Sequence, residues 1–197
     1  MSVLKESKDA FEIQRAEAWH LQDLGWHLLP IYGVREGRCE CGRDCHSPGK
    51  HPKTAHGLKD ATNDARTLSA WEDRWPGGST ALRTGPESGV VVIDIDLDKG
   101  GPDSWTELTA GRAPIRTVTA ITGGGGRHYF FNHPGETVRN RRGSLGPGID
   151  IRGDNGYVVL PGSTHLDGVY SWLDGHSPLD LDLADLPKWL AAQLIGA

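Results

Sequence analysis

The alternation of apolar and polar positions predicts a chain of short strands and helices. The pattern is helical near both ends and mostly extended after residue 80. In chain order, the expected elements are a helix over 8–24, a strand over 26–33, a helix over 64–75, strands over 80–85 and 89–97, a helix over 103–108, strands over 116–122, 127–132, 148–152 and 157–161, and a helix over 183–197. With no repeat and no low-complexity linker, this order predicts one mixed α/β (α+β) domain over residues 1–197.

Residues 153–156, with the sequence GDNG, give a strong turn signal. The expected strands over 148–152 and 157–161 lie directly on either side of it. We therefore expect these two strands to meet there as an antiparallel pair.

The strand over 89–97 changes character along its length. The apolar residues 90–93 are followed by carboxylates at every second position, Asp94, Asp96 and Asp98. Side chains alternate between the faces of a strand, so successive carboxylates share a face, roughly 6–7 Å apart. Like charges at that spacing repel unless a cation, such as a divalent metal with oxygen ligands, neutralises them. The alternative is a strand whose last residues are simply solvated. We expect Asp98 to lie outside any metal site.

Two later segments carry further candidate residues. Residues 122–132, TGGGGRHYFFN, join four glycines to a strand in which His128 and Phe130 share a face. Glycines let backbone N–H groups approach a phosphate closely, although a flexible turn before a core histidine has the same pattern. In residues 148–152, Asp150 and Arg152 share a face, as a surface ion pair also would.

These motifs, in this order, resemble the bifunctional DNA primase/polymerase N-terminal domain of the archaeo-eukaryotic primase superfamily. That family has an acidic D-x-D or D-x-E strand, a small-x-His strand, and a third acidic strand followed by a basic residue, matched here by Asp94 and Asp96, by Gly126-Arg127-His128, and by Asp150 and Arg152. The resemblance covers about residues 20–175. It implies a primase-polymerase fold with an RRM-like catalytic sheet. Gly126 departs from the pattern, because many superfamily members have serine there.

The resemblance also implies roles for the site residues. Asp94, Asp96 and Asp150 would hold two Mg²⁺ or Mn²⁺ ions, which activate a 3′-hydroxyl and stabilise the leaving pyrophosphate. His128 would contact the incoming triphosphate. The residues expected to bind the nucleotide together with it are Gly126, Arg152 and Ser163, with His165 as a further candidate.

Residues 38–57 form a loop with three cysteines, three histidines and little apolar content. Thiolates and imidazoles clustered in this way suit tetrahedral zinc, and a closed four-ligand site would be structural. His46 directly follows Cys45 and fits the same tetrahedron poorly, so the preferred ligands are Cys39, Cys41, Cys45 and His51. Some relatives carry a zinc-binding insertion of this kind. A reduced, metal-free loop is the alternative, since three cysteines within seven residues make a disulfide framework unlikely.

Charge is distributed unevenly along the chain. The formal net charge is −5, but residues 110–153 contain seven arginines and two acidic residues, a local charge of +5. A basic surface of this kind suits the backbone of a nucleic acid. Its densest part supplies the nucleic-acid-binding candidates Arg139, Arg141 and Arg142, although a solvated arginine-rich turn has the same sequence pattern.

These observations favour template-directed nucleotidyl transfer, as a DNA primase, a DNA polymerase or both. The expected partners are a single-stranded DNA template, a primer, and NTP or dNTP. Because the sequence has no Walker motif, a replicative helicase partner would lie on another chain or in an absent region. The alternatives are a metal-dependent nuclease that uses the same carboxylates and a non-catalytic nucleic-acid-binding module of the same fold.

The sequence also bears on location. No apolar run approaches the ~20 residues that a membrane helix requires, and the first residues show no secretory signal. We therefore expect no membrane association and a cytoplasmic protein.

Overall fold

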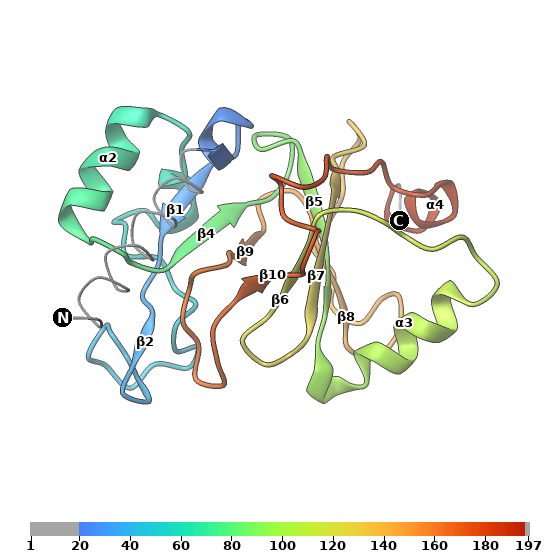
Figure 1. Cartoon of the computed structure of the whole chain (residues 1–197), viewed down its shortest axis with the longest axis horizontal. Coiled ribbons are helices and arrows are strands. Elements are labelled where there is room, and N and C mark those ends of the chain that lie inside the picture. The colour runs from blue at the N-terminus through green and yellow to red at the C-terminus, as the bar shows by residue number, and fades with distance from the viewer. Residues whose placement is uncertain (1–19, 196–197) are drawn as a thin grey trace.

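A computed structural model of the chain describes residues 20–195, which form two packed antiparallel sheets with helices on their outer sides, together with a third sheet of only two strands (Figure 1). The larger sheet has the strand order β10-β6-β7-β5-β8, and the smaller has the order β1-β4-β9. The strands are β1 (Leu28–Pro30), β2 (Val34–Arg35), β3 (Arg38–Cys39), β4 (Thr80–Arg83), β5 (Val90–Ile95), β6 (Thr119–Ile121), β7 (Arg127–Asn132), β8 (Ile149–Arg152), β9 (Tyr157–Val159) and β10 (Ser171–Trp172). The helices are α2 (Ala65–Arg74), α3 (Gly101–Thr109) and α4 (Lys188–Leu194), with short 3₁₀ turns η1 (Gly57–Asp60) and η2 (Leu97–Lys99). This arrangement confirms the predicted fold class.

Strand β5 is buried over its whole length, because both faces of the five-stranded sheet are covered. On one face, Val91, Ile93 and Ile95 pack in a core that includes apolar residues of α3 and α4. On the other face, Val90 and Val92 pack with residues of the three-stranded sheet. Figure 1 shows α3 and α4 on one side of the larger sheet and the smaller sheet on the other. Burial on both faces explains the unbroken apolar run that begins this strand.

The prediction that the strands on either side of residues 153–156 pair with each other is wrong. Strand β8 pairs with β5 in the larger sheet, whereas β9 pairs with β4 in the smaller sheet. The turn forms, but the chain uses it to cross between sheets, because apolar side chains of β9 are buried against β4 and its neighbours. A local turn signal gives the position of a bend and leaves open which strand each side pairs with.

Two of the three segments that run between these sheets are bonded to each other through Thr84. Residues 84–89 lead from β4 to β5, and residues 153–156 lead from β8 to β9. The Thr84 N–H donates to the Gly156 carbonyl at 2.9 Å, and its hydroxyl donates to the Gly153 carbonyl at 2.6 Å. Thr84 is fully buried, so these two hydrogen bonds join the connecting segments out of contact with water.

Other predicted elements match in part. Residues 20–23 are helical, and the remainder of the expected helix over 8–24 lies outside the described residues. The closing helix starts late, at Lys188 after Pro187, and β2, β3 and β10 were not predicted. No helix within residues 20–195 is both long and apolar enough to cross a membrane. The assignment of residues 1–197 to one domain stays a prediction.

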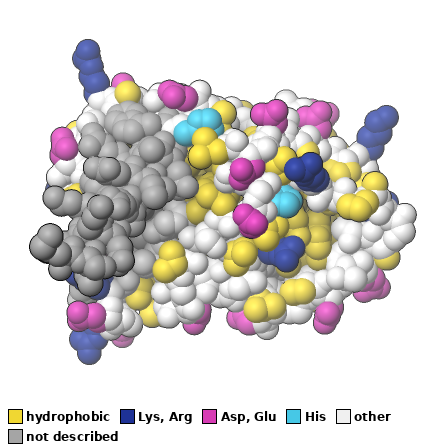
Figure 2. All heavy atoms as spheres, in the orientation of Figure 1, with side chains coloured by type: hydrophobic (Ala, Val, Ile, Leu, Met, Phe, Trp, Pro, Cys, Tyr) yellow, Lys and Arg dark blue, Asp and Glu magenta, His cyan; other side chains and the backbone are white. Residues whose placement is uncertain are grey.

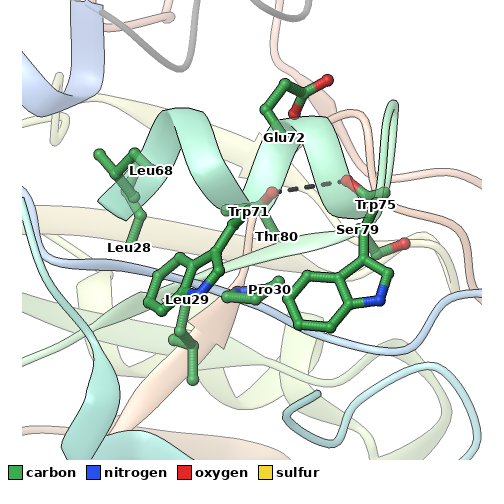
Figure 3. Close-up of a pocket in the computed structure, with 10 residues that line it drawn as sticks. Leu28, Leu29, Pro30, Leu68, Trp71, Glu72, Trp75, Ser79 and Thr80 are labelled. Carbon is green, nitrogen blue, oxygen red and sulfur yellow. Dashed lines mark hydrogen bonds between the residues drawn. The ribbon is translucent and has the colours of Figure 1, made fainter. Parts of the chain in front are cut away.

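An apolar cavity of about 60 Å³ lies between α2 and the edge of the smaller sheet (Figure 3). In Figure 3 the rings of Trp71 and Trp75 extend from α2 toward β1, with Pro30 between them. None of the carboxylates or histidines predicted from the sequence lines this cavity. It therefore belongs to the packing of α2 and is separate from the polar site described below.

Candidate active site and metal-binding loop

Three of the predicted site residues lie side by side in one row across the five-stranded sheet. Asp94 of β5 is in register with His128 of β7 on one side and with Asp150 of β8 on the other. Residues directly opposite in antiparallel pairs project from the same face. Motifs that are far apart in the sequence therefore meet at the acidic end of β5.

This row is nearly closed to solvent and internally paired. Asp94 and Asp150 are each 7% exposed, and His128 is 4% exposed. Arg152 Nη2 donates to Asp94 Oδ2 at 2.8 Å and to Asp150 Oδ2 at 3.0 Å, and Arg152 Nε donates to Asp94 Oδ2 at 3.2 Å. His128 Nε2 lies 3.4 Å from Asp94 Oδ1. Each oxygen of Asp94 therefore faces a nitrogen of a basic side chain.

Asp94 and Arg152 each stabilise the charged form of the other. Burial raises the pKa of Asp94, but the His128 imidazole and the Arg152 guanidinium outweigh it and hold that pKa well below its ordinary value. Burial likewise lowers the pKa of Arg152, but Asp94 and Asp150 outweigh it and raise that pKa above its ordinary value. A depressed carboxyl pKa stabilises the fold above the pKa of the unfolded chain, and this contribution is lost as pH falls through the folded value. At neutral pH, Asp94 is therefore ionised and Arg152 is charged.

Asp96 lies apart from this row, because η2 begins immediately after it. Its Oδ2 accepts a hydrogen bond from Lys99 Nζ at 2.6 Å. Asp94, Asp96 and Asp150 do not form a compact group of ligand atoms in the described structure. Asp98 is exposed on η2, and its absence from the site stays a prediction.

Two residues near the row were missed by the sequence analysis. Lys99 directly follows the acidic run, and a basic residue at that point could have drawn attention to it. The buried ring of Tyr170 lies 5.9 Å from the ring of His128, measured between centroids. Burial and then the charges of Asp94 and Asp96 raise the pKa of the Tyr170 phenol. No motif marks Tyr170, since only the packing of the chain before β10 brings it here.

Gly126 is required by a close approach of two backbones. A Cβ atom at this position would overlap the carbonyl oxygen of Ile95 on the adjacent strand β5. The preceding glycines form a tight turn between β6 and β7, in which the Gly125 N–H donates to the Thr122 carbonyl at 2.9 Å. The contact with Ile95 gives a structural reason for glycine where many relatives have serine. The predicted approach of this loop to phosphate stays a prediction.

The hydroxyl of Ser163 is already engaged within the fold. It accepts from the Thr80 N–H at 2.9 Å and donates to the Thr80 carbonyl at 3.0 Å, and the residue is fully buried. These bonds attach the segment after β9 to β4. They do not support a contact with a nucleotide, so we leave Ser163 out of the proposed site. His165 lies 3.2 Å from Asp167, measured from Nδ1 to Oδ2, and burial lowers its pKa.

The three candidate arginines for nucleic acid binding lie next to β8. Arg141 bridges to Ile151 of β8 through backbone hydrogen bonds of 3.1 and 2.7 Å. The side chains of Arg139 and Arg142 are exposed, whereas Arg141 is half-buried and its Nη2 is enclosed without a hydrogen-bond partner among the described residues. On the face shown in Figure 2, acidic, basic and histidine side chains gather around exposed apolar surface near the middle of the molecule. Two of the three arginines are thus available to a ligand beside the strand that carries Asp150.

The cysteine-rich loop brings together the predicted ligand set. The ligand atoms of Cys39, Cys41, Cys45 and His51 all lie within 4.8 Å of one another, and they form the one such compact group found in residues 20–195. The β2–β3 hairpin holds Cys39, whose Sγ lies 3.2 Å from His51 Nε2. His46 is exposed and outside the group.

Neighbouring groups shift the pKa of two of the three cysteine thiols. Burial raises the pKa of Cys39, but hydrogen bonds from the backbone of Cys41 and Gly49 and contacts with Cys41 and His51 bring it down to about 6. Burial together with the neighbouring thiols Cys39 and Cys41 raises the pKa of Cys45 to about 11. One thiolate therefore suppresses the next unless a cation lies between them. Three sulfurs and one imidazole nitrogen converging in this way suit a structural zinc ion.

The comparison with known families agrees with this geometry. The chain matches the family described as bifunctional DNA primase/polymerase, N-terminal, over residues 17–189. The chain belongs to this primase/polymerase family. The match spans the carboxylate row as well as the cysteine-rich loop, and it confirms the resemblance found in the sequence. Family membership implies a nucleotidyltransferase of the primase/polymerase type, with DNA and nucleotides as substrates. No curated protein matches the chain.

Replacing Gly126 with alanine should destabilise the fold. The added methyl group would press on Ile95 of β5, and overpacking of this kind costs about 1–3 kcal/mol in the free energy of unfolding. Gly124→Ala is the matched control, because a Cβ there would approach only the Asp167 carboxylate, at 3.9 Å. Urea denaturation measures both variants, and equal midpoints would contradict the packing argument.

The purified, reduced protein should contain one zinc ion per chain. Cys41→Ser should lose the ion and lower the melting temperature by more than about 5 °C, because metal binding contributes to folding here. His46→Ala should keep the ion, since His46 lies outside the ligand group. Elemental analysis measures the zinc content of each variant. Zinc retained in His51→Ala but lost in His46→Ala would show that the proposed ligand set is wrong.

Proposed function

We propose that this chain is a template-directed nucleotidyltransferase, which starts or extends a primer by joining nucleotides to a 3′-hydroxyl. The observation that carries the proposal is the register that sets Asp94 between His128 and Asp150. This arrangement unites the three motifs of the primase/polymerase family in one polar row at the end of a buried strand. Membership of the family supports the same reaction class.

The carboxylates in the row fit a divalent cation. Asp94 Oδ2 and Asp150 Oδ2 both lie within 3.0 Å of the same nitrogen atom of Arg152, so one cation can contact both. Carboxylate oxygens are also the ligands that Mg²⁺ and Mn²⁺ prefer. Asp94, Asp96 and Asp150 would hold two such ions, with Asp96 turning from Lys99 toward the row. When bound, the ions supply activation of the 3′-hydroxyl and neutralisation of the leaving pyrophosphate.

The chain's own basic residues complete the site. His128 Nε2 lies 3.4 Å from Asp94 Oδ1, and its imidazole would contact the incoming triphosphate. Arg152 is 28% exposed at its side chain and can present its guanidinium to phosphate oxygens. Because the row is largely closed to water, these charges act at low local dielectric and stabilise the developing charge strongly. In the reaction the 3′-oxygen attacks the α-phosphorus, and the bond to pyrophosphate breaks.

The template and the primer would lie along the arginine segment next to β8. Arg139 and Arg142 are exposed there, and Arg141 between them bridges to Ile151 of β8. Phosphate contacts by arginine position a nucleic acid strand without reading its sequence. The zinc ion of the cysteine-rich loop would have a structural role only.

Asp96→Asn should abolish nucleotide incorporation and leave the fold intact. Asp96 is half-exposed and pairs with an exposed lysine, so the substitution costs little stability but removes a proposed metal ligand. Asp98→Asn is the matched control, since Asp98 is exposed and lies two residues further along. Extension of a labelled primer on a single-stranded template measures the effect. Normal extension by Asp96→Asn would contradict the assignment, and shortening of the primer by the unaltered protein would indicate a nuclease.

The double variant Arg139→Ala, Arg142→Ala should bind single-stranded DNA about tenfold more weakly. Losing two phosphate contacts should also reduce the slope of log affinity against log salt by roughly 1.4. Nucleotide affinity should be unchanged, because neither side chain takes part in the ion pairs of the row. The matched control, Arg66→Ala with Arg74→Ala, removes the same charge from the exposed surface of α2. Fluorescence anisotropy at several salt concentrations compares the two, and equal salt slopes would rule out this arginine segment.

A further inference from the structure

Every carboxylate of the proposed site is neutralised by a cation of the chain itself. Arg152 Nη2 lies between Asp94 Oδ2 and Asp150 Oδ2, at 2.8 and 3.0 Å. Lys99 Nζ lies 2.6 Å from Asp96 Oδ2. The structure therefore has two internal cations at the oxygens that the proposed reaction requires for metal binding.

The two pairs differ in how firmly they are held. Lys99 and Asp96 lie near the surface, with side chains 62% and 28% exposed, so solvent weakens their pairing. Asp94 and Asp150 are 10% and 11% exposed at their side chains, and Arg152 is 28% exposed. Two buried carboxylates this close repel each other, and a cation between them relieves the repulsion. Arg152 is the residue of the chain that contacts both of them.

We propose that Arg152 occupies the position of a catalytic divalent cation, and that the two exchange. Arg152 leaves Asp94 and Asp150 when the cation binds, and its freed guanidinium then binds the phosphates of the incoming nucleotide. This inference rests on the proposed function. The geometry supports it, because a single nitrogen atom contacts both oxygens that a bridging cation would contact. The rotation is possible because Arg152 is the last residue of β8 and its guanidinium is partly open to solvent.

The exchange has a thermodynamic consequence. A divalent cation that binds alone must displace Arg152 from two carboxylates, so part of its binding free energy is spent on breaking the ion pairs. A triphosphate offers the displaced guanidinium a new anionic partner. The nucleotide and the cation therefore favour each other's binding through Arg152, in addition to any direct contact between them.

The test measures Mn²⁺ binding without nucleotide, in zinc-loaded protein whose cysteine-rich loop is already occupied. Electron paramagnetic resonance follows the loss of the free Mn²⁺ signal, and Asp94→Asn supplies the background from other sites. Arg152→Gln should bind Mn²⁺ ten- to a hundredfold more tightly than the unaltered protein, as expected when a competing charge-assisted pair is removed. Arg127→Gln is the matched control, because Arg127 is exposed in the next row of the sheet, on the opposite face. It should leave Mn²⁺ affinity within about threefold.

The outcomes separate the inference from the proposed function. If the unaltered protein and Arg152→Gln bind Mn²⁺ equally at Asp94, the exchange is wrong and the metal site stands. Equal tightening by Arg127→Gln would also overturn the exchange, because the effect would then be one of net charge. If neither protein binds Mn²⁺ above the Asp94→Asn background, the carboxylates hold no metal and the proposed function fails.

A second measurement needs no substitution at Arg152, so it holds even if Arg152→Gln does not fold. The Nε–H signal of Arg152 in a ¹H–¹⁵N spectrum reports its hydrogen bond to Asp94 in the unaltered protein. Saturating Mg²⁺ should move this signal toward the position of a solvated arginine. A signal that stays in place while Mg²⁺ shifts the backbone resonances of Asp94 and Asp150 would overturn the exchange.

Discussion

The ion pairs of Arg152 with Asp94 and Asp150 are the interaction on which the rest of the site depends. Asp94 is the next-to-last residue of β5, a strand that is buried on both faces, so a charged carboxylate lies at the edge of the core. Removing one partner of a buried ion pair leaves an uncompensated charge, which costs about 3–5 kcal/mol. Arg152 and His128 compensate Asp94 from the two neighbouring strands. The same contacts that stabilise the sheet therefore keep Asp94 ionised.

Close backbone contacts decide what lies next to this row. A Cβ at Gly153 would overlap the carbonyl oxygen of Val138, so the glycine after β8 allows the segment before Arg139 to approach it. The Asp154 N–H then donates to that carbonyl at 2.7 Å. This approach sets the arginine segment beside the strand that carries Asp150 and Arg152. The proposed nucleic acid surface and the proposed active site thus share one edge of the sheet.

The cysteine-rich loop is ordered by a different kind of interaction. It contributes little to the apolar cores, and its ligand atoms converge on one point instead. The Tyr32 N–H donates to the His51 carbonyl at 2.9 Å, and the rings of these residues lie 4.8 Å apart between centroids. His51 therefore connects the metal-ligand group to the segment that follows β1. Zinc at this point would replace the apolar burial that the loop lacks.

Much of the candidate site could be predicted from the sequence, because it depends on interactions between residues that are close together in the chain. Alternation along residues 90–96 placed Asp94 and Val92 on one face, and the spacing of cysteine and histidine selected the four clustered ligands. The order of the acidic and histidine motifs was sufficient to indicate the family. These features depend on residue type and on separations of a few residues along the chain. At such short separations, the local backbone geometry sets the relative positions of the side chains.

The remaining features depend on contacts between distant segments. The turn at 153–156 was evident, but only the packing of two sheets decided that β8 and β9 pair with different partners. Likewise, Asp96 could be identified as a carboxylate near the site, but its pairing with Lys99 depends on how η2 continues the chain. The sequence by itself determined which groups carry charge and which face each strand presents. Tertiary structure alone decided which cation meets which carboxylate, because strand register and burial are set by the whole core at once.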